Sequence, residues 1–124
     1  MLNSPHVMLA GSGADHFADG IGTAAKFNNP TGVAVDVSGN VYVADLGNER
    51  IRKISPQSEV STLAGSGNYG HNDGSGTNVR FQNPVGLTID WEGNLFLADN
   101  SKIRKITTKL KADKLKIEEK EKNK

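Results

Sequence analysis

The sequence predicts an all-β fold built from two consecutive copies of one repeat, and two observations support this prediction. The run Leu-Ala-Gly-Ser-Gly at residues 9–13 recurs 54 residues later, at residues 63–67, so the chain is internally repeated. The 14 glycines are typical of many tight turns between short strands. A hydrophobic content of 35% is below the usual range for a domain with a large core of its own, and helical architecture is disfavoured.

Four short strands are expected in the first copy. Residues 32–36 and 40–44 are rich in β-forming residues and are separated by a turn, in which Gly39 can adopt the positive φ that a tight hairpin requires. A second turn contains Pro56, which presets φ, and joins the last two strands. The expected strands are residues 32–36, 40–44, 50–54 and 59–63.

The second copy keeps this order of strands and turns. Residues 84–99 align with residues 30–45 without a gap, and Ile-Arg-Lys-Ile at residues 51–54 recurs at residues 103–106, an offset of 52. Two residues are therefore missing from one turn of the second copy, and loops are where deletions are tolerated. Four antiparallel strands are expected in each copy.

Apolar character decreases from the first strand of each copy outward. The first two strands are apolar on both faces, since Val33 and Val35 point to the side opposite Ala34, while residues 50–54 are mostly basic. This gradient is typical of a blade stacked between two others around a central axis, whereas a single sandwich would have a wet face. The sequence therefore predicts a partial β-propeller of two four-stranded antiparallel blades, with a charged C-terminal extension.

The same residues resemble a known family. Residues 30–36, 39–45 and 48–54, which residues 84–106 repeat, are similar to the consensus of the NHL repeat, and the resemblance covers residues 7–106. The second copy departs from the consensus in its short turn at residues 99–102. The resemblance implies a propeller of six blades in many members. It also implies relatives of three kinds: interaction scaffolds, lactonase- or lyase-like enzymes, and modules that bind single-stranded RNA.

Four segments are expected along the chain: a strand that completes a blade (1–10), a first NHL repeat (11–62), a second NHL repeat (63–108) and a charged tail (109–124). Residues 1–108 contain 8 Lys or Arg and 10 Asp or Glu, while the tail contains 7 Lys and 4 acidic residues. Neither imbalance argues for nucleic acid or an anionic membrane. The sequence shows no signal peptide and no membrane-spanning run, so a soluble location without a membrane partner is expected and the compartment stays open.

No cofactor, metal or catalytic residue is expected. The sequence has no Cys, which excludes thiolate zinc sites, and His6, His16 and His71 lack the spacing of metal ligands. Residues 72–78 are rich in oxygen ligands but lack the Glu that closes a calcium loop. The metal ligands that the resemblance implies for propeller enzymes come from several blades, and two blades do not supply that set.

Six turn residues are expected to have structural roles. A carboxylate that opens a turn commonly accepts hydrogen bonds from the backbone N–H groups of its own loop, and a glycine before Asn suits a positive φ. These residues are Asp36, Gly39, Asp45, Asp90, Gly93 and Asp99.

Five residues are candidates for binding a partner. Trp91 lies in the first hairpin turn of the second copy, where an exposed aromatic residue anchors partners, and burial against a neighbouring blade is an equal alternative. Arg50, Arg52, Lys102 and Arg104 belong to a basic band on the third strands. Such a band could contact the phosphates of RNA. A solvated outer strand that discourages edge pairing is the favoured interpretation, because no aromatic residue is interleaved with the basic ones.

The predicted function is that of a protein-protein interaction scaffold, with an enzyme fragment and an RNA-binding module as alternatives. Homo-oligomers formed by strand donation are a further expectation. Residues 6–9 align with residues 60–63, so the N-terminal strand of one chain is expected to complete the last blade of another. Three chains would then supply six blades. Nonspecific association or partial unfolding is the alternative that stays open.

Overall fold

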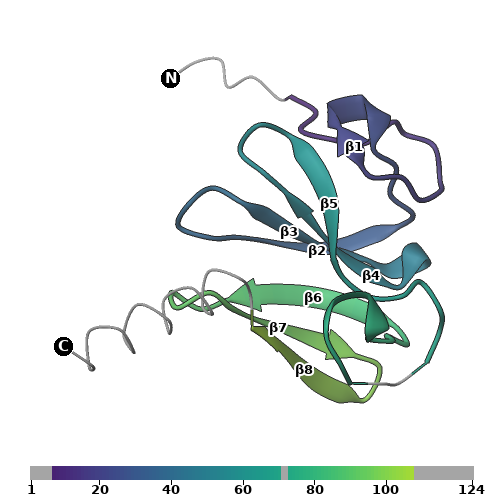
Figure 1. Ribbon diagram of the computed structural model, residues 1–124, viewed down its shortest axis with the longest axis vertical. Helices are drawn as coiled ribbons and strands as arrows, with labels where there is room; N and C mark the ends of the chain where they lie inside the picture. The colour runs from purple at the N-terminus through teal and green to yellow at the C-terminus, as the bar shows by residue number, and fades with distance from the viewer. Residues whose placement is uncertain (1–6, 71–72, 108–124) are drawn as a thin grey trace.

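The computed structural model describes residues 7–70 and 73–107, which form two antiparallel sheets (Figure 1). The strand order is β1-β5-β4-β3-β2 in the larger sheet and β6-β7-β8 in the smaller one. The strands are β1 (Gly20–Ile21), β2 (Pro30–Val35), β3 (Val41–Asp45), β4 (Arg50–Ile54), β5 (Glu59–Ala64), β6 (Pro84–Ile89), β7 (Asn94–Asp99) and β8 (Lys102–Thr107). Three short 3-10 helices are η1 (Gly22–Ala24), η2 (Leu46–Asn48) and η3 (Gly76–Asn78).

The first blade, β2 to β5, has the four antiparallel strands that the sequence predicts. The turns before β3 and β7 are equivalent in the two copies. Gly39 and Gly93 have φ values of 90° and 94°, which confirms the predicted left-handed conformation at both turns. The propeller-type, all-β architecture predicted from the repeat is therefore present.

The second blade differs from the first. Within the described residues it has three strands, β6 to β8, where the repeat predicts four. A fourth strand after β8, like the charged tail predicted at residues 109–124, would lie outside the described residues. Residues 7–9 form no strand within the single chain, and their pairing with another chain stays a prediction.

The two blades stack face to face, as Figure 1 shows for the sheets that contain β2 and β6. Small residues allow the inner strands to approach closely, since a Cβ atom added to Gly32 would lie 3.0 Å from the Cα atom of Gly86. Thr31 Oγ1 also donates a hydrogen bond to the carbonyl of Pro84, at 3.2 Å. Both blades contribute to the core between them, whose buried members are Tyr42, Ala44, Ile51, Ala64, Val79, Phe81, Leu95 and Leu97.

The opposite face of the first blade is only partly covered. A smaller core joins Val43, Ile54 and Val60 to Ala25, which belongs to the segment before β2. This segment lies on the side of the first blade that is remote from β6–β8 (Figure 1). Val33 and Val35 of β2 point to the same face and stay largely exposed. The prediction that both faces of the first strand are buried is therefore wrong for this face.

No helix in residues 7–70 or 73–107 is long and apolar enough to span a membrane.

Candidate functional site

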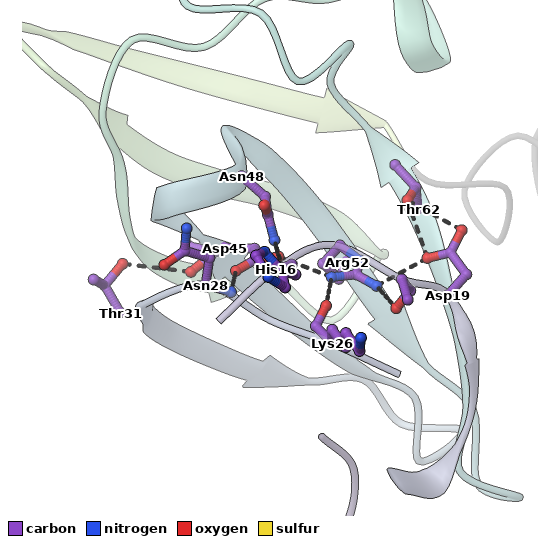
Figure 2. A network of polar contacts seen from close by, with 11 residues as sticks. His16, Asp19, Lys26, Asn28, Thr31, Asp45, Asn48, Arg52 and Thr62 are labelled. Atoms are coloured by element: carbon purple, nitrogen blue, oxygen red, sulfur yellow. Dashed lines mark hydrogen bonds and ion pairs between the residues drawn. The ribbon is translucent and has the colours of Figure 1, made fainter. Parts of the chain in front are cut away.

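A buried arginine on β4 organises the first blade. Arg52 is 0% exposed, and its Nη1 and Nη2 atoms form ion pairs with Asp45 (2.8 Å) and Asp19 (2.9 Å). The same two nitrogens donate hydrogen bonds to the carbonyl oxygens of Lys26 (2.7 Å) and Ala18 (2.6 Å). Figure 2 shows the contacts of Arg52 with Asp45, Asp19 and Lys26. The planar guanidinium thus ties the segment before β2 to the outer half of the sheet.

Aromatic rings and a second set of hydrogen bonds complete this network. The guanidinium of Arg52 lies 4.7 Å from the ring centroids of both Phe17 and Phe27, within the range of cation–π attraction. Asp45 accepts one hydrogen bond from the backbone N–H of Asn28 (2.8 Å) and one from the side chain of Asn48 (2.7 Å). Each carboxylate oxygen of Asp45 therefore has a donor in the described structure.

The second blade repeats the network around Arg104. Its Nη1 atom pairs with Asp99 (2.9 Å) and donates to the carbonyl of Arg80 (2.6 Å), while its Nη2 atom pairs with Asp73 (3.0 Å). The guanidinium lies 4.8 Å from the ring centroid of Phe81. Asp99 in turn accepts hydrogen bonds from the backbone N–H groups at positions 82 and 83.

The sequence prediction of a solvated basic band is wrong for two of its members. Arg52 and Arg104 are 0% and 8% exposed. Side chains alternate between the faces of a strand, and these two point to the face covered by the segment before each blade. Ion pairing with aspartates offsets the loss of hydration there, so neither guanidinium is presented to a partner.

The repeat contained a signal for this network. An Asp at positions 19 and 73, a second Asp at positions 45 and 99, and an Arg at positions 52 and 104 recur together. Asp45 and Asp99 accept backbone N–H groups from the segment before the blade's first strand, whereas the sequence predicted donors in their own turns.

Asp36 and Asp90 cap the hairpin turns in the manner that the sequence predicts. Asp36 accepts the backbone N–H groups of Ser38 and Asn40, both at 2.9 Å, and Asp90 accepts the corresponding groups in the second blade. Burial acts to raise the pKa of Asp36, but hydrogen bonds from Asn40, Tyr42 and Ser38 together hold that pKa below its ordinary value. Burial, and then the hydrogen bond to Asp36, raises the pKa of Tyr42.

The remaining partner-binding candidates lie at opposite ends of the blades. Trp91 is 78% exposed in the turn between β6 and β7, and Val37, its counterpart between β2 and β3, is 80% exposed. Arg50 and Lys102 begin the third strands, so antiparallel connectivity places them at the other end. The Arg50 guanidinium lies 3.7 Å from the Phe17 ring centroid and donates to the carbonyl of Ser66, while Lys102 is exposed.

No group of three or more His, Cys, Asp or Glu residues in the described parts of the chain has the geometry to hold a metal ion. His16 is exposed, and its backbone carbonyl accepts a hydrogen bond from the Asn48 side chain. His6 and His71 lie outside the described residues.

Comparison with known proteins supports the repeat assignment. The NHL repeat model matches residues 27–54. The chain is 40% identical over 91 residues to Protein SUPPRESSOR OF QUENCHING 1, chloroplastic, of Arabidopsis thaliana, an alignment that covers 71% of this chain and 9% of that protein. It is 36% identical over 100 residues to NHL repeat-containing protein 2 of Homo sapiens, covering 74% of this chain and 14% of that protein. The chain thus spans a small fraction of the length of these relatives.

Solved structures show the same fold. A structural genomics protein of unknown function from Bacteroides thetaiotaomicron superposes with a TM-score of 0.72 at 30% identity, covering 77% of this chain and 25% of that one. An auxiliary nutrient binding protein from the same organism superposes with a TM-score of 0.69 at 31% identity, covering 78% and 27%. With the repeat match at residues 27–54 and the blades described above, this chain is an NHL-repeat segment that forms part of a β-propeller.

Proposed function

We propose that the chain is a non-catalytic protein-interaction module that binds its partner through the β2–β3 and β6–β7 turns. The observation that carries the proposal is the exposure of Trp91 and Val37 at equivalent turns of adjacent blades. The inner strands β2 and β6 pack together with Gly32 against its own repeat counterpart, Gly86, so the turns that follow them lie at the same end of the stack.

These turns are suited to recognition because they are rigid. Asp36 and Asp90 each accept backbone N–H groups from within their own turn, which fixes the loop before any partner arrives. A preorganised turn loses little conformational entropy on binding. Tryptophan is also among the residues most often found to dominate the energy of protein interfaces.

Two alternatives receive less support. Binding of RNA by the basic residues of the third strands is less supported, because Arg52 and Arg104 are already ion-paired with aspartates inside the blades and do not face solvent. A propeller enzyme is the other alternative, and the curated relatives bear names that refer to NHL repeats or to suppression of quenching rather than to a reaction.

The proposal is tested by placing a photo-reactive amino acid at position 37, identifying the protein that cross-links to it, and measuring the affinity of that protein in purified form. We expect Trp91→Ala to weaken binding by at least about tenfold, because it removes the central aromatic anchor. Tyr69→Ala is the matched control, since Tyr69 is also an exposed aromatic residue but lies in the loop at the other end of the blades. Equal dissociation constants for the Trp91→Ala and Tyr69→Ala variants would contradict the proposed site.

A further inference from the structure

A groove runs along the outer edge of β8 in the second blade. Its volume is about 750 Å³. β8 forms one wall, the loop at residues 73–76 forms the other, and Val79 and Phe81 lie between them. Among the described residues, no strand is hydrogen-bonded to this edge of β8.

The first blade shows what fits such a groove. There the equivalent space is occupied by β5, which pairs with β4 on one side and with β1 on the other, where Gly20 faces Val60. Val60 is buried in the smaller core, and Thr62 Oγ1 donates to the carboxylate of Asp19 at 3.2 Å. In the second blade, β8 corresponds to β4 and residues 73–76 correspond to β1. The two segments that would flank a fourth strand, as β4 and β1 flank β5, are therefore both present.

Side chains beside the groove are exposed where their counterparts are covered. Ile103 is 78% exposed, whereas Ile51, at the same position of the first blade, is 0% exposed. The carboxylate of Asp73 is also far more exposed than that of Asp19, which lies beside Thr62. An uncovered strand edge with an apolar side chain beside it is a template for an added strand.

We propose that this groove binds residues 7–10 of a second copy of the chain as an antiparallel strand. Residues 9–13 are identical in sequence to residues 63–67, where β5 ends and the loop to the next blade begins. The backbone after this point makes equivalent hydrogen bonds in the two copies. The N–H of Gly11 donates to the carbonyl of Gly22, and the N–H of Gly65 donates to the carbonyl of Gly76, both at 3.1 Å.

Residues 7–10 therefore lead into the first blade as β5 leads into the second. Val7 and Met8 are among the most exposed apolar side chains of the described structure. In a second copy's groove they would occupy the positions of Ser61 and Thr62, and Ala10 would occupy that of Ala64, which pairs with Ile51. Pairing in the groove would thus place Ala10 opposite Ile103, as Ala64 lies opposite Ile51. Because Ile51 is buried in the core between the blades, Ile103 would be covered by the first blade of the second copy that the strand brings into contact.

Seating this strand also brings together two faces that are open in the single chain. Phe96 and Ala98 of the second blade correspond to Tyr42 and Ala44, which are buried between the blades. Val33 of the first blade corresponds to Leu87, which packs against the same core. The contact between copies would therefore repeat the contact between blades.

Glycines on the inner strands agree with this arrangement. A Cβ atom on Gly32 would press against the next blade at 3.0 Å, whereas one on Gly86 would meet nothing within 4 Å. At Gly32 the neighbouring blade packs against the inner strand. At Gly86 the corresponding space is open and could accept the blade of a second copy. Such a head-to-tail contact closes into a ring when the rotation permits, and three copies would supply six blades.

Charge favours residues 7–10 over the chain's own tail as the occupant. Lys102 and Lys105 are exposed along β8, and the tail at residues 109–124 carries 7 Lys against 4 acidic residues, so the two repel each other. Residues 7–10 carry no charge. A lysine at this edge is compatible with pairing, because Lys53, the counterpart of Lys105, faces Ser61 of β5.

The proposal is tested by sedimentation velocity on the 124-residue chain over a range of concentrations. We expect assemblies that are whole multiples of 13.2 kDa. The double substitution Val7→Pro with Met8→Pro should give monomers, because successive N–H groups of a strand point to opposite neighbours and both would be lost. Its matched control, Val7→Thr with Met8→Thr, keeps the N–H groups and should still assemble.

The acceptor side is tested with Ile103→Asp, which should also give monomers, while Val37→Asp, an equally exposed position outside the groove, should not. A mixture of the proline variant and the Ile103→Asp variant retains one intact donor and one intact acceptor, so a dimer is expected. Circular dichroism confirms that each variant is folded. Val37 and Trp91 belong to the proposed partner site, so loss of partner binding without loss of assembly separates the two proposals.

Three results would overturn strand donation. The first is a folded monomer for the intact chain at every concentration. The second is assembly that survives both the proline pair and Ile103→Asp. The third is assembly that disappears when residues 109–124 are deleted and persists when residues 1–10 are deleted.

Discussion

At the scale of single residues, the molecule is organised by one arginine in each blade. Arg52 and Arg104 lie on the third strand of their blades and bind the segment that precedes each blade, and each forms ion pairs with two aspartates. Removing one member of a buried ion pair leaves the other charge buried without compensation, which typically costs about 3–5 kcal/mol. The arginines therefore attach the segment that precedes each blade to that blade's sheet.

We expect Arg52→Met to lower the free energy of unfolding by about 3–5 kcal/mol in urea denaturation, because Asp45 stays buried with its charge unpaired. Adding Asp45→Asn should restore part of the loss, since the double variant no longer buries an isolated charge. Lys53→Met is the control and should change stability by less than about 1 kcal/mol, because Lys53 is not among the ion-paired residues of the described structure. Similar losses for the Arg52→Met and Lys53→Met variants would refute this role.

At the scale of elements, local sequence predicts the strands and turns well. The four strands of the first blade, the positive φ of Gly39 and Gly93, and the capping roles of Asp36 and Asp90 all follow from short-range patterns. Contacts within a few residues decide these features, so periodicity and turn chemistry are sufficient to find them.

The sequence was less informative about burial. Arginine is rarely buried, so a basic strand is normally interpreted as an outer, solvated one. Two partners make the burial of Arg52 favourable: Asp45 lies seven residues away, and Asp19 lies 33 residues away, where no local pattern links it to the arginine. The exposure of Val33 likewise depends on which segments pack against β2 from elsewhere in the chain.

The β2–β3 turn provides a prediction about pH. The pKa of Asp36 is held below the ordinary value of 3.8, so its ionised form stabilises the folded state. That contribution is complete at neutral pH and is lost as the pH falls through 3.8 toward the lower pKa of the folded state. We expect the stability difference between the native chain and Asp36→Asn to shrink over this range, measured by urea denaturation from pH 7 to pH 3. A difference that grows on acidification would contradict the assigned direction, and carboxyl NMR titration of Asp36 measures the pKa itself.

At the scale of the whole molecule, the core between the blades makes the two sheets interdependent. Its buried residues come from both, with Tyr42, Ala44 and Ile51 on one side and Leu95 and Leu97 on the other. Repeat proteins derive much of their stability from such interfaces between neighbouring units. The two blades are therefore expected to unfold together rather than one after the other.

Phe81 is the residue with which to test this interdependence, because it is fully buried in the shared core. We expect Phe81→Ala to lower the free energy of unfolding by about 3–5 kcal/mol, the usual cost of removing a buried ring. Amide hydrogen exchange, which reports the opening energy of each segment, should show nearly the same loss in β3 as in β7. Phe27→Ala is the matched control, since Phe27 is the repeat counterpart but packs against the smaller core on the far face of the first blade. That variant should reduce protection in β3 to β5 more than in β7. If Phe81→Ala reduced protection in β6–β8 alone and left β3 unchanged, the blades would be independent folding units, and the shared core would contribute little to the first blade.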